Sequence, residues 1–204
     1  MISKICVALL CFVSLLTSAH ANTLLVFGDS LSAAYNLRQQ QGWVSLLSQQ
    51  LNSSHPDVNV INASVSGETT QGGLSRLPKL LDTHQPNWVV LELGANDGLR
   101  GYPLQQMKQN LAQMIEQSKQ QGATVLLLGN HLPSNYGRTY TTQFFNIYKE
   151  LAEQHQVAYV PFMLENVALN KSLMQNDGLH PNAEGQPVVL ENIAPTLVPM
   201  LDKP

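Results

Sequence analysis

Several features that would direct a functional interpretation are scarce in this sequence. Only two cysteines occur among 204 residues, Cys6 and Cys11, and both lie in the N-terminal segment. A chain that loses that segment keeps no thiol, which excludes a cysteine nucleophile, a disulfide and a cysteine metal ligand. Charged residues make up 12% of the chain, with a formal net charge of −3 and no run of like charge. This composition gives no electrostatic basis for binding nucleic acid.

Cofactor motifs are absent as well. The glycines form neither Gly-x-Gly-x-x-Gly nor a P-loop, which argues against a nucleotide cofactor. No cluster of histidines and carboxylates has metal-ligand spacing, so we expect no metal and no other cofactor. The sequence has no internal repeat and no linker, and its 44% apolar residues suffice for one core. The chain is therefore expected to form a single domain.

The first residues differ in composition from the rest. Lys4 provides a short positive region, residues 5–16 are almost wholly apolar, and small residues lead up to Ala21. This order predicts a secretory signal peptide over residues 1–21, cleaved near Ala21, and hence a periplasmic or secreted protein. The alternative is a membrane anchor, but the apolar core is short for spanning a bilayer. We therefore expect a domain over residues 22–204 without a stable membrane anchor.

Apolar runs alternate with helical patterns along the remaining chain. Strands are predicted at residues 24–27, 58–62, 88–93, 123–128 and 157–160. Because these runs are apolar on both faces, they indicate a parallel sheet covered by helices on both sides. Five such strands predict a three-layer, flavodoxin-like α/β fold with strand order 2-1-3-4-5.

The helices between the strands are marked by apolar spacing and interrupted by prolines. They are predicted at residues 42–51, 74–81, 104–121 and 141–154, with a last helix capped by Asn182. We expect Pro78 to shorten or bend the second helix, and Pro187, Pro195 and Pro199 to shorten or kink the last. A turn into a further helix is expected at Gly28-Asp29-Ser30-Leu31, directly after the first strand.

Polar residues follow the strands where the strands end. Ser30 follows the first strand, Gly67 the second and Asn96 the third, and Asp177 and His180 lie in the segment after the fifth. Because the carboxyl ends of parallel strands share one edge of the sheet, these residues are expected to come together.

Their chemistry is that of a nucleophilic site. Serine is a weak nucleophile unless a base accepts its proton, and histidine titrates in the required range. Asp177, one turn from His180, can hold the second ring nitrogen, so Ser30, His180 and Asp177 are the predicted catalytic residues. The backbone N–H groups of Ser30 and Gly67 and the Asn96 amide are the candidate oxyanion donors. The alternative role for Ser30 is that of a helix cap.

These motifs also resemble a known family. Gly28-Asp29-Ser30-Leu31, Gly67, Gly94-x-Asn96-Asp97 and Asp177-x-x-His180 resemble, in this order, the four blocks of the SGNH (GDSL) hydrolase superfamily. The likeness extends from about Thr23 to the last helix. It implies a monomeric, cofactor-free hydrolase of carboxylic esters and acyl thioesters, of arylesterase, thioesterase or lysophospholipase type. In that resemblance Ser30 matches the nucleophile, His180 the base, Asp177 its partner, and Gly67 and Asn96 the oxyanion donors.

The resemblance also indicates where an acyl chain lies. In that superfamily the segment matching residues 98–103 is a mobile loop over the acyl chain, which implies Leu99 and Tyr102 as substrate contacts. Tyr136 is a further candidate at the acyl site, with buried packing as the alternative. His131 and Ala183 stand where the family commonly has basic residues, so two permanent positive charges near the mouth are missing.

Two other functions remain open on the sequence alone. The chain could be an acetylesterase that acts on a polysaccharide or a small molecule, or a non-catalytic module that binds lipid or carbohydrate in the same cleft. In each case the partner is a small acyl compound or a glycan rather than a nucleic acid. A series of ester chain lengths tests the first alternative, and covalent labelling of Ser30 by a fluorophosphonate tests the second.

Overall fold

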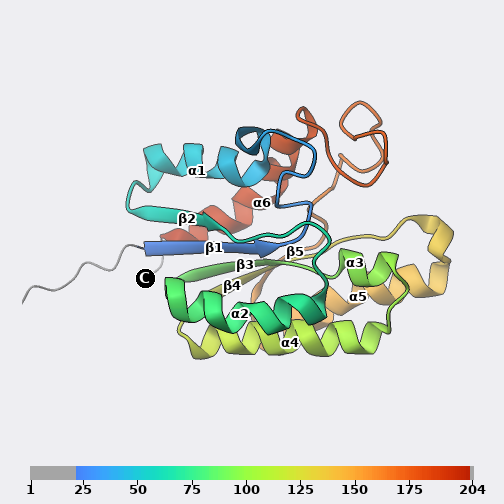
Figure 1. The fold of residues 1–204 in the computed structure, drawn as a ribbon, viewed down its shortest axis with the longest axis horizontal. Coiled ribbons are helices and arrows are strands. Elements are labelled where there is room, and N and C mark those ends of the chain that lie inside the picture. The colour runs from blue at the N-terminus through green and yellow to red at the C-terminus, as the bar shows by residue number, and fades with distance from the viewer. Residues whose placement is uncertain (1–21, 203–204) are drawn as a thin grey trace, which may run out of the picture.

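The computed structural model describes residues 22–202, in which one parallel sheet carries helices on both faces (Figure 1). The predicted signal peptide, its cleavage near Ala21 and both cysteines lie outside the described residues. The strands are β1 (Asn22–Gly28), β2 (Val58–Asn62), β3 (Trp88–Glu92), β4 (Thr124–Leu128) and β5 (Ala158–Val160). Their order is β2-β1-β3-β4-β5 and every pairing is parallel, which confirms the predicted fold and strand order.

Helices cover the sheet in two layers. They are α1 (Trp43–Ser54), α2 (Thr70–His84), α3 (Ala95–Leu99), α4 (Leu104–Gln120), α5 (Arg138–His155) and α6 (Gly185–Leu201). Figure 1 shows α1 and α6 on one face of the sheet and α2, α4 and α5 on the other. Within residues 22–202 no helix combines the length and the apolar character needed to cross a membrane.

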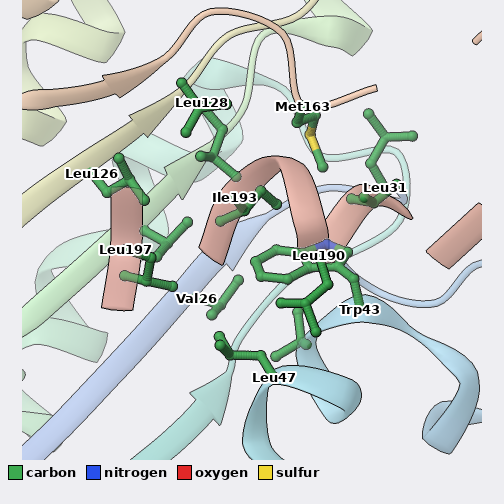
Figure 2. Close-up of a cluster of buried hydrophobic side chains, with 14 of the residues drawn as sticks. Val26, Leu31, Trp43, Leu47, Leu126, Leu128, Met163, Leu190, Ile193 and Leu197 are labelled. Carbon is green, nitrogen blue, oxygen red and sulfur yellow. The ribbon is translucent and has the colours of Figure 1, made fainter. Parts of the chain in front are cut away.

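Alternate side chains of each strand enter two separate cores. Leu24 and Val26 of β1 pack with α1 and α6 around the fully buried Trp43 (Figure 2). Leu25 and Phe27 point into the other core, with side chains of α2, α4 and α5. This two-sided burial explains the uninterrupted apolar runs, because both faces of each strand are removed from water.

The segment after β1 differs from the prediction. No helix begins at Ser30: residues 30–36 form successive turns, and the first α-helix starts at Trp43. Ala34 and Asn36 have φ values of 57° and 56°, in the left-handed region that a right-handed helix cannot contain. The helix-cap interpretation of Ser30 is therefore wrong.

The effect expected of the prolines is also wrong in part. α6 runs without interruption over 17 residues that include Pro187, Pro195 and Pro199, and α2 extends over 15 residues with Pro78 inside. Pro187 lies in the first turn, where its missing N–H has no intrahelical acceptor. Burial of the apolar face of α6 in the core outweighs the cost of the two later prolines. Asn182 does contribute to the start of α6, since its side-chain oxygen accepts the Gly185 N–H at 3.0 Å.

Candidate active site

A cavity of about 1040 Å³ opens at the carboxyl edge of the sheet. Ser30, Asn96 and His180 line it, which confirms that the chain folds these three separate motifs to one place. Much of the remaining wall is apolar, with side chains from Leu31, Leu99, Leu132, Phe162, Leu164, Leu169, Met174 and Leu179. A polar cluster at one end of an apolar cavity suits a ligand that has one reactive polar group and an apolar chain.

Ser30, His180 and Asp177 form a continuous hydrogen-bonded series. The distance from Ser30 Oγ to His180 Nε2 is 2.8 Å, and His180 Nδ1 lies 2.7 Å from Asp177 Oδ2. Because an ionised carboxylate only accepts, His180 Nδ1 must carry a hydrogen. In the neutral ring Nε2 is then an acceptor directed at the Ser30 hydroxyl, which is the tautomer that a general base requires.

Asp177 is held as a charged acceptor by its own segment. Its Oδ1 accepts the backbone N–H groups of Leu179 at 2.9 Å and His180 at 3.0 Å. Burial disfavours the charged form, but these bonds and the His180 ring outweigh it, so the pKa of Asp177 lies below its ordinary value. Asp177 contacts the Nδ1 side of the His180 ring, opposite Ser30, and is not among the residues that line the cavity.

The Asn96 side chain, from the motif after β3, contacts the carboxylate of Asp29, from the motif after β1. Asn96 Nδ2 donates to Asp29 Oδ2 at 2.9 Å, and the Leu31 N–H donates to Asp29 Oδ1 at 3.0 Å. Burial raises the pKa of Asp29 from 3.8 to about 6, against the lowering effect of these two hydrogen bonds. Asp29 is therefore ionised at neutral pH, and it fixes one hydrogen of the Asn96 amide.

A second buried acid, Glu92, lies beneath the turn that carries Ser30. Its Oε2 accepts the Ser32 hydroxyl at 2.8 Å and the Asp29 N–H at 3.2 Å. A Cβ on Gly28 would meet this oxygen at 2.5 Å, so only glycine allows the approach. Burial, followed by the charge of Asp29, raises the pKa of Glu92 well above its ordinary value, which favours its neutral form. Sequence reasoning missed this residue because it stands at the end of an apolar strand.

Gly67 lies near the site but outside the cavity wall. Its φ of 81° is in the left-handed region, which favours glycine. The Arg100 guanidinium donates to the Gly67 carbonyl at 3.1 Å and so ties the loop after β2 to the segment after α3. Within residues 22–202 no protein acceptor takes the N–H of Gly67 or of Ser30.

The three candidate acyl contacts have different surroundings. Leu99 lines the cavity, whereas Tyr102 and Tyr136 are not among the lining residues. Tyr136 instead donates its hydroxyl to the Leu99 carbonyl at 2.8 Å. Tyr140, from α5, donates to the Tyr102 carbonyl at 3.1 Å. Two tyrosines thus hold the backbone of the segment that the resemblance places over the acyl chain.

Three ring contacts of the histidines at this cavity were not anticipated. The Tyr35 ring lies 4.6 Å from the His180 ring, centroid to centroid. His131 lines the cavity and stacks on Phe145 at 3.9 Å, with the edge of Phe162 at 4.6 Å. Burial lowers the pKa of His131, which favours its neutral form. No signal in the sequence would pair these residues, since each contact joins a loop to another segment through the tertiary fold.

Within residues 22–202, no three histidine, cysteine, aspartate or glutamate side chains lie close enough together to hold a metal ion.

Comparison with known proteins agrees with this geometry. A sequence model of the GDSL-like lipase/acylhydrolase family matches residues 26–188. The chain is 50% identical over 192 residues to "Esterase TesA" of Pseudomonas aeruginosa, covering 94% of this chain and 96% of that protein. It is 46% identical over 193 residues to "Thioesterase 1/protease 1/lysophospholipase L1" of Escherichia coli K12, covering 94% and 91%. The solved structure of the psychrotrophic esterase EstA from Pseudoalteromonas sp., inhibited by monoethylphosphonate, superposes with a TM-score of 0.84 at 40% identity, covering 89% and 100%.

The chain therefore belongs to the GDSL-like lipase/acylhydrolase family and is an ester hydrolase. This confirms the predicted superfamily and favours the enzyme over a non-catalytic binding module.

Proposed function

We propose that the protein hydrolyses carboxylic esters and acyl thioesters through an acyl-enzyme on Ser30. The observation that carries the proposal is the unbroken series from Ser30 Oγ through His180 to Asp177, with distances of 2.8 and 2.7 Å. A serine in this arrangement is activated by an adjacent base that is itself oriented by an acid.

The reaction follows from the donors and acceptors. As Ser30 Oγ bonds to the acyl carbon, its proton moves to His180 Nε2, and the carbonyl oxygen becomes an oxyanion. Asp177 stabilises the imidazolium. Collapse of the intermediate breaks the bond to the leaving oxygen or sulfur, which takes the proton from His180. Water then attacks the acyl-enzyme with His180 again as the base, and the carboxylic acid is released.

The oxyanion donors are the Ser30 N–H, the Gly67 N–H and the second hydrogen of Asn96 Nδ2. Neither N–H has a protein acceptor in the described part of the chain, and Asn96 uses only one amide hydrogen on Asp29. Donors that are fixed before the reaction stabilise developing charge without reorganisation, which is why such groups contribute strongly to catalysis.

The acyl portion of the substrate is proposed to be longer than acetyl. A cavity of about 1040 Å³ with leucine, methionine and phenylalanine in its wall far exceeds the space that an acetyl group fills. Lysophospholipids and aryl esters fit the same description, and a relative carries "lysophospholipase" in its name. This favours the broad esterase and thioesterase over the acetylesterase.

We further propose that the enzyme acts outside the cytoplasm. The support is the composition of residues 1–21, with Lys4, an apolar core and small residues before Ala21. N-terminal sequencing of protein from the extracytoplasmic fraction tests this, and a start at Met1 would contradict it.

Covalent labelling tests the mechanism. A fluorophosphonate should label Ser30, and the Ser30→Ala variant should lose both labelling and hydrolysis of p-nitrophenyl octanoate while keeping its circular dichroism spectrum. The matched control is Ser32→Ala: Ser32 lies on the same turn, but its hydroxyl is bonded to Glu92, so labelling should persist. Substantial hydrolysis by the Ser30→Ala variant would refute the proposal. In a series of p-nitrophenyl esters of increasing chain length, we expect kcat/KM to be higher for the octanoyl ester than for the acetyl ester.

A further inference from the structure

Large apolar side chains that are exposed are gathered on one edge of the molecule. Among residues 22–202 they are Tyr35, Val65, Tyr102, Leu169 and Leu179. Each lies in a segment that follows the carboxyl end of a strand: β1, β2, β3 and, for both leucines, β5. In Figure 1 these segments lie at the same end of the sheet. Single exposed apolar residues are ordinary, but a set confined to one edge marks an interaction surface.

Leu169 is the most exposed member of this set, because 99% of the residue is accessible to solvent. It is displayed by a fixed turn. The next residue, Asn170, donates its N–H to the carbonyl of the fully buried Val167 at 2.9 Å, and its Oδ1 accepts the Ser172 hydroxyl at 2.7 Å. Asn192 of α6 donates to the Glu165 carbonyl at 2.8 Å. The leucine is thus held out from the body by an ordered segment.

The exposed set is continuous with the mouth of the active site. Leu169 and Leu179 also line the cavity, and the Tyr35 ring contacts the His180 ring at 4.6 Å. Whatever covers this edge therefore lies across the entrance through which an acyl group reaches Ser30. That position suits a partner which itself contains acyl chains.

Charge on the same edge suits phosphate headgroups. Although the chain carries a net charge of −3, exposed basic residues outnumber exposed acidic ones on this edge by four to three. The basic ones are Arg38, Arg100, Arg138 and Lys171, and the acidic ones are Glu165, Asp177 and Glu184, of which Asp177 is engaged by His180. Aromatic, aliphatic and basic side chains together are the composition of proteins that lie in a membrane interface.

We propose that this edge docks on the surface of a phospholipid bilayer, with Leu169, Val65 and Tyr102 entering the headgroup layer around the cavity mouth. The inference rests on the proposed function for the identity of the acyl substrate, but the docking itself requires no hydrolysis. When the edge is docked, the cavity mouth lies against the bilayer. Lipid acyl esters can then reach Ser30 without first being released into water, where their apolar chains would be exposed.

Flotation with vesicles tests the docking in the Ser30→Ala protein, which cannot consume the lipid. The protein should float with phosphatidylcholine vesicles and more strongly when phosphatidylglycerol is added. Leu169→Ser should lower the partition coefficient by about tenfold to a hundredfold, the ratio that burial of one leucine side chain implies. Val65→Ser should lower it by several-fold. In the protein that retains Ser30, Val65→Ser should leave hydrolysis of soluble p-nitrophenyl acetate unchanged.

Val198→Ser is the matched control, because it makes the same chemical change in an apolar groove between α1 and α6. It should leave the partition coefficient unchanged. Failure of the Ser30→Ala protein to float, or a loss with Val198→Ser but not with Val65→Ser, would overturn the docking proposal. If the unmodified enzyme does not hydrolyse p-nitrophenyl octanoate, the proposed function is refuted instead. The two failures are therefore distinguishable.

Discussion

Asn96 donates a hydrogen bond from its amide nitrogen to the buried Asp29 carboxylate at 2.9 Å. An amide nitrogen has two hydrogens, so this bond fixes the orientation of the group and leaves the second hydrogen for a ligand in the cavity that both residues line. Asp29, next to the proposed nucleophile Ser30, therefore orients the proposed oxyanion donor Asn96.

Replacing this acid by its amide should impair catalysis without unfolding the protein. In Asp29→Asn a single amide oxygen replaces the two carboxylate oxygens that accept the Asn96 amide and the Leu31 N–H, so one of these two donors then faces an NH2 group and Asn96 is no longer firmly oriented. We expect kcat for p-nitrophenyl octanoate to fall by about a hundredfold with KM changed little, as for loss of one oxyanion donor.

The same measurement on Asn96→Ala and on the double variant identifies the route. Because Asp29 is proposed to act through Asn96, the double variant should be scarcely slower than Asn96→Ala alone. Independent losses that multiply in the double variant would show that Asp29 acts on the reaction by another path.

Burial of Asp29 should also be visible in stability. Its pKa rises from 3.8 to about 6, so between about pH 4 and pH 6 the native state binds more protons than the unfolded state. Its contribution is therefore most favourable below about pH 4 and is lost as the pH rises through about 6. Relative to Asp29→Asn, the unmodified protein should gain about 2 kcal/mol on going from pH 7 to pH 4, measured by urea unfolding. A difference that is constant with pH, or that has the opposite sign, would contradict this.

The elements that the sequence predicted correctly are those determined by local pattern. Strand runs apolar on both faces allow only a sheet covered on both sides, and the positions of Ser30, Asn96 and His180 follow from where those strands end. Leu99 is predicted instead from the family resemblance, which places residues 98–103 over the acyl chain. These predictions needed no knowledge of tertiary contacts.

Interactions between distant segments could not be predicted in this way. Glu92 is an acid within an apolar strand, and only the structure shows the Ser32 hydroxyl above it. The turns after Ser30 depend on the left-handed conformations of Ala34 and Asn36, which alanine rarely adopts. The prolines of α6 are tolerated because the helix gains burial against the sheet, and this burial is a tertiary effect.

Glu92 should be replaceable by glutamine but not by alanine. Because burial raises the pKa of Glu92 and so favours its neutral form, Glu92→Gln retains a neutral oxygen acceptor for Ser32 and Asp29 and should cost less than about 1 kcal/mol of unfolding free energy. Glu92→Ala leaves two buried donors without an acceptor and should cost about 2–5 kcal/mol. Urea unfolding at pH 7 measures both. Equal destabilisation by the two substitutions would mean that the charge of Glu92, rather than its hydrogen bonding, is what the fold requires.

Tyr136 should influence the acyl chain through Leu99. Its hydroxyl holds the Leu99 carbonyl at 2.8 Å, and Leu99 in turn lines the cavity. Tyr136→Phe removes one hydrogen bond worth about 1 kcal/mol, so kcat/KM for p-nitrophenyl octanoate should fall by about fivefold. The acetyl ester is too short to depend on this wall and should be hydrolysed at the same rate. Tyr159→Phe is the control, since the Tyr159 hydroxyl is buried without a partner among the described residues and its removal should change neither rate. An equal loss of kcat/KM with both esters would mean that Tyr136 supports the fold as a whole rather than the wall that binds the acyl chain.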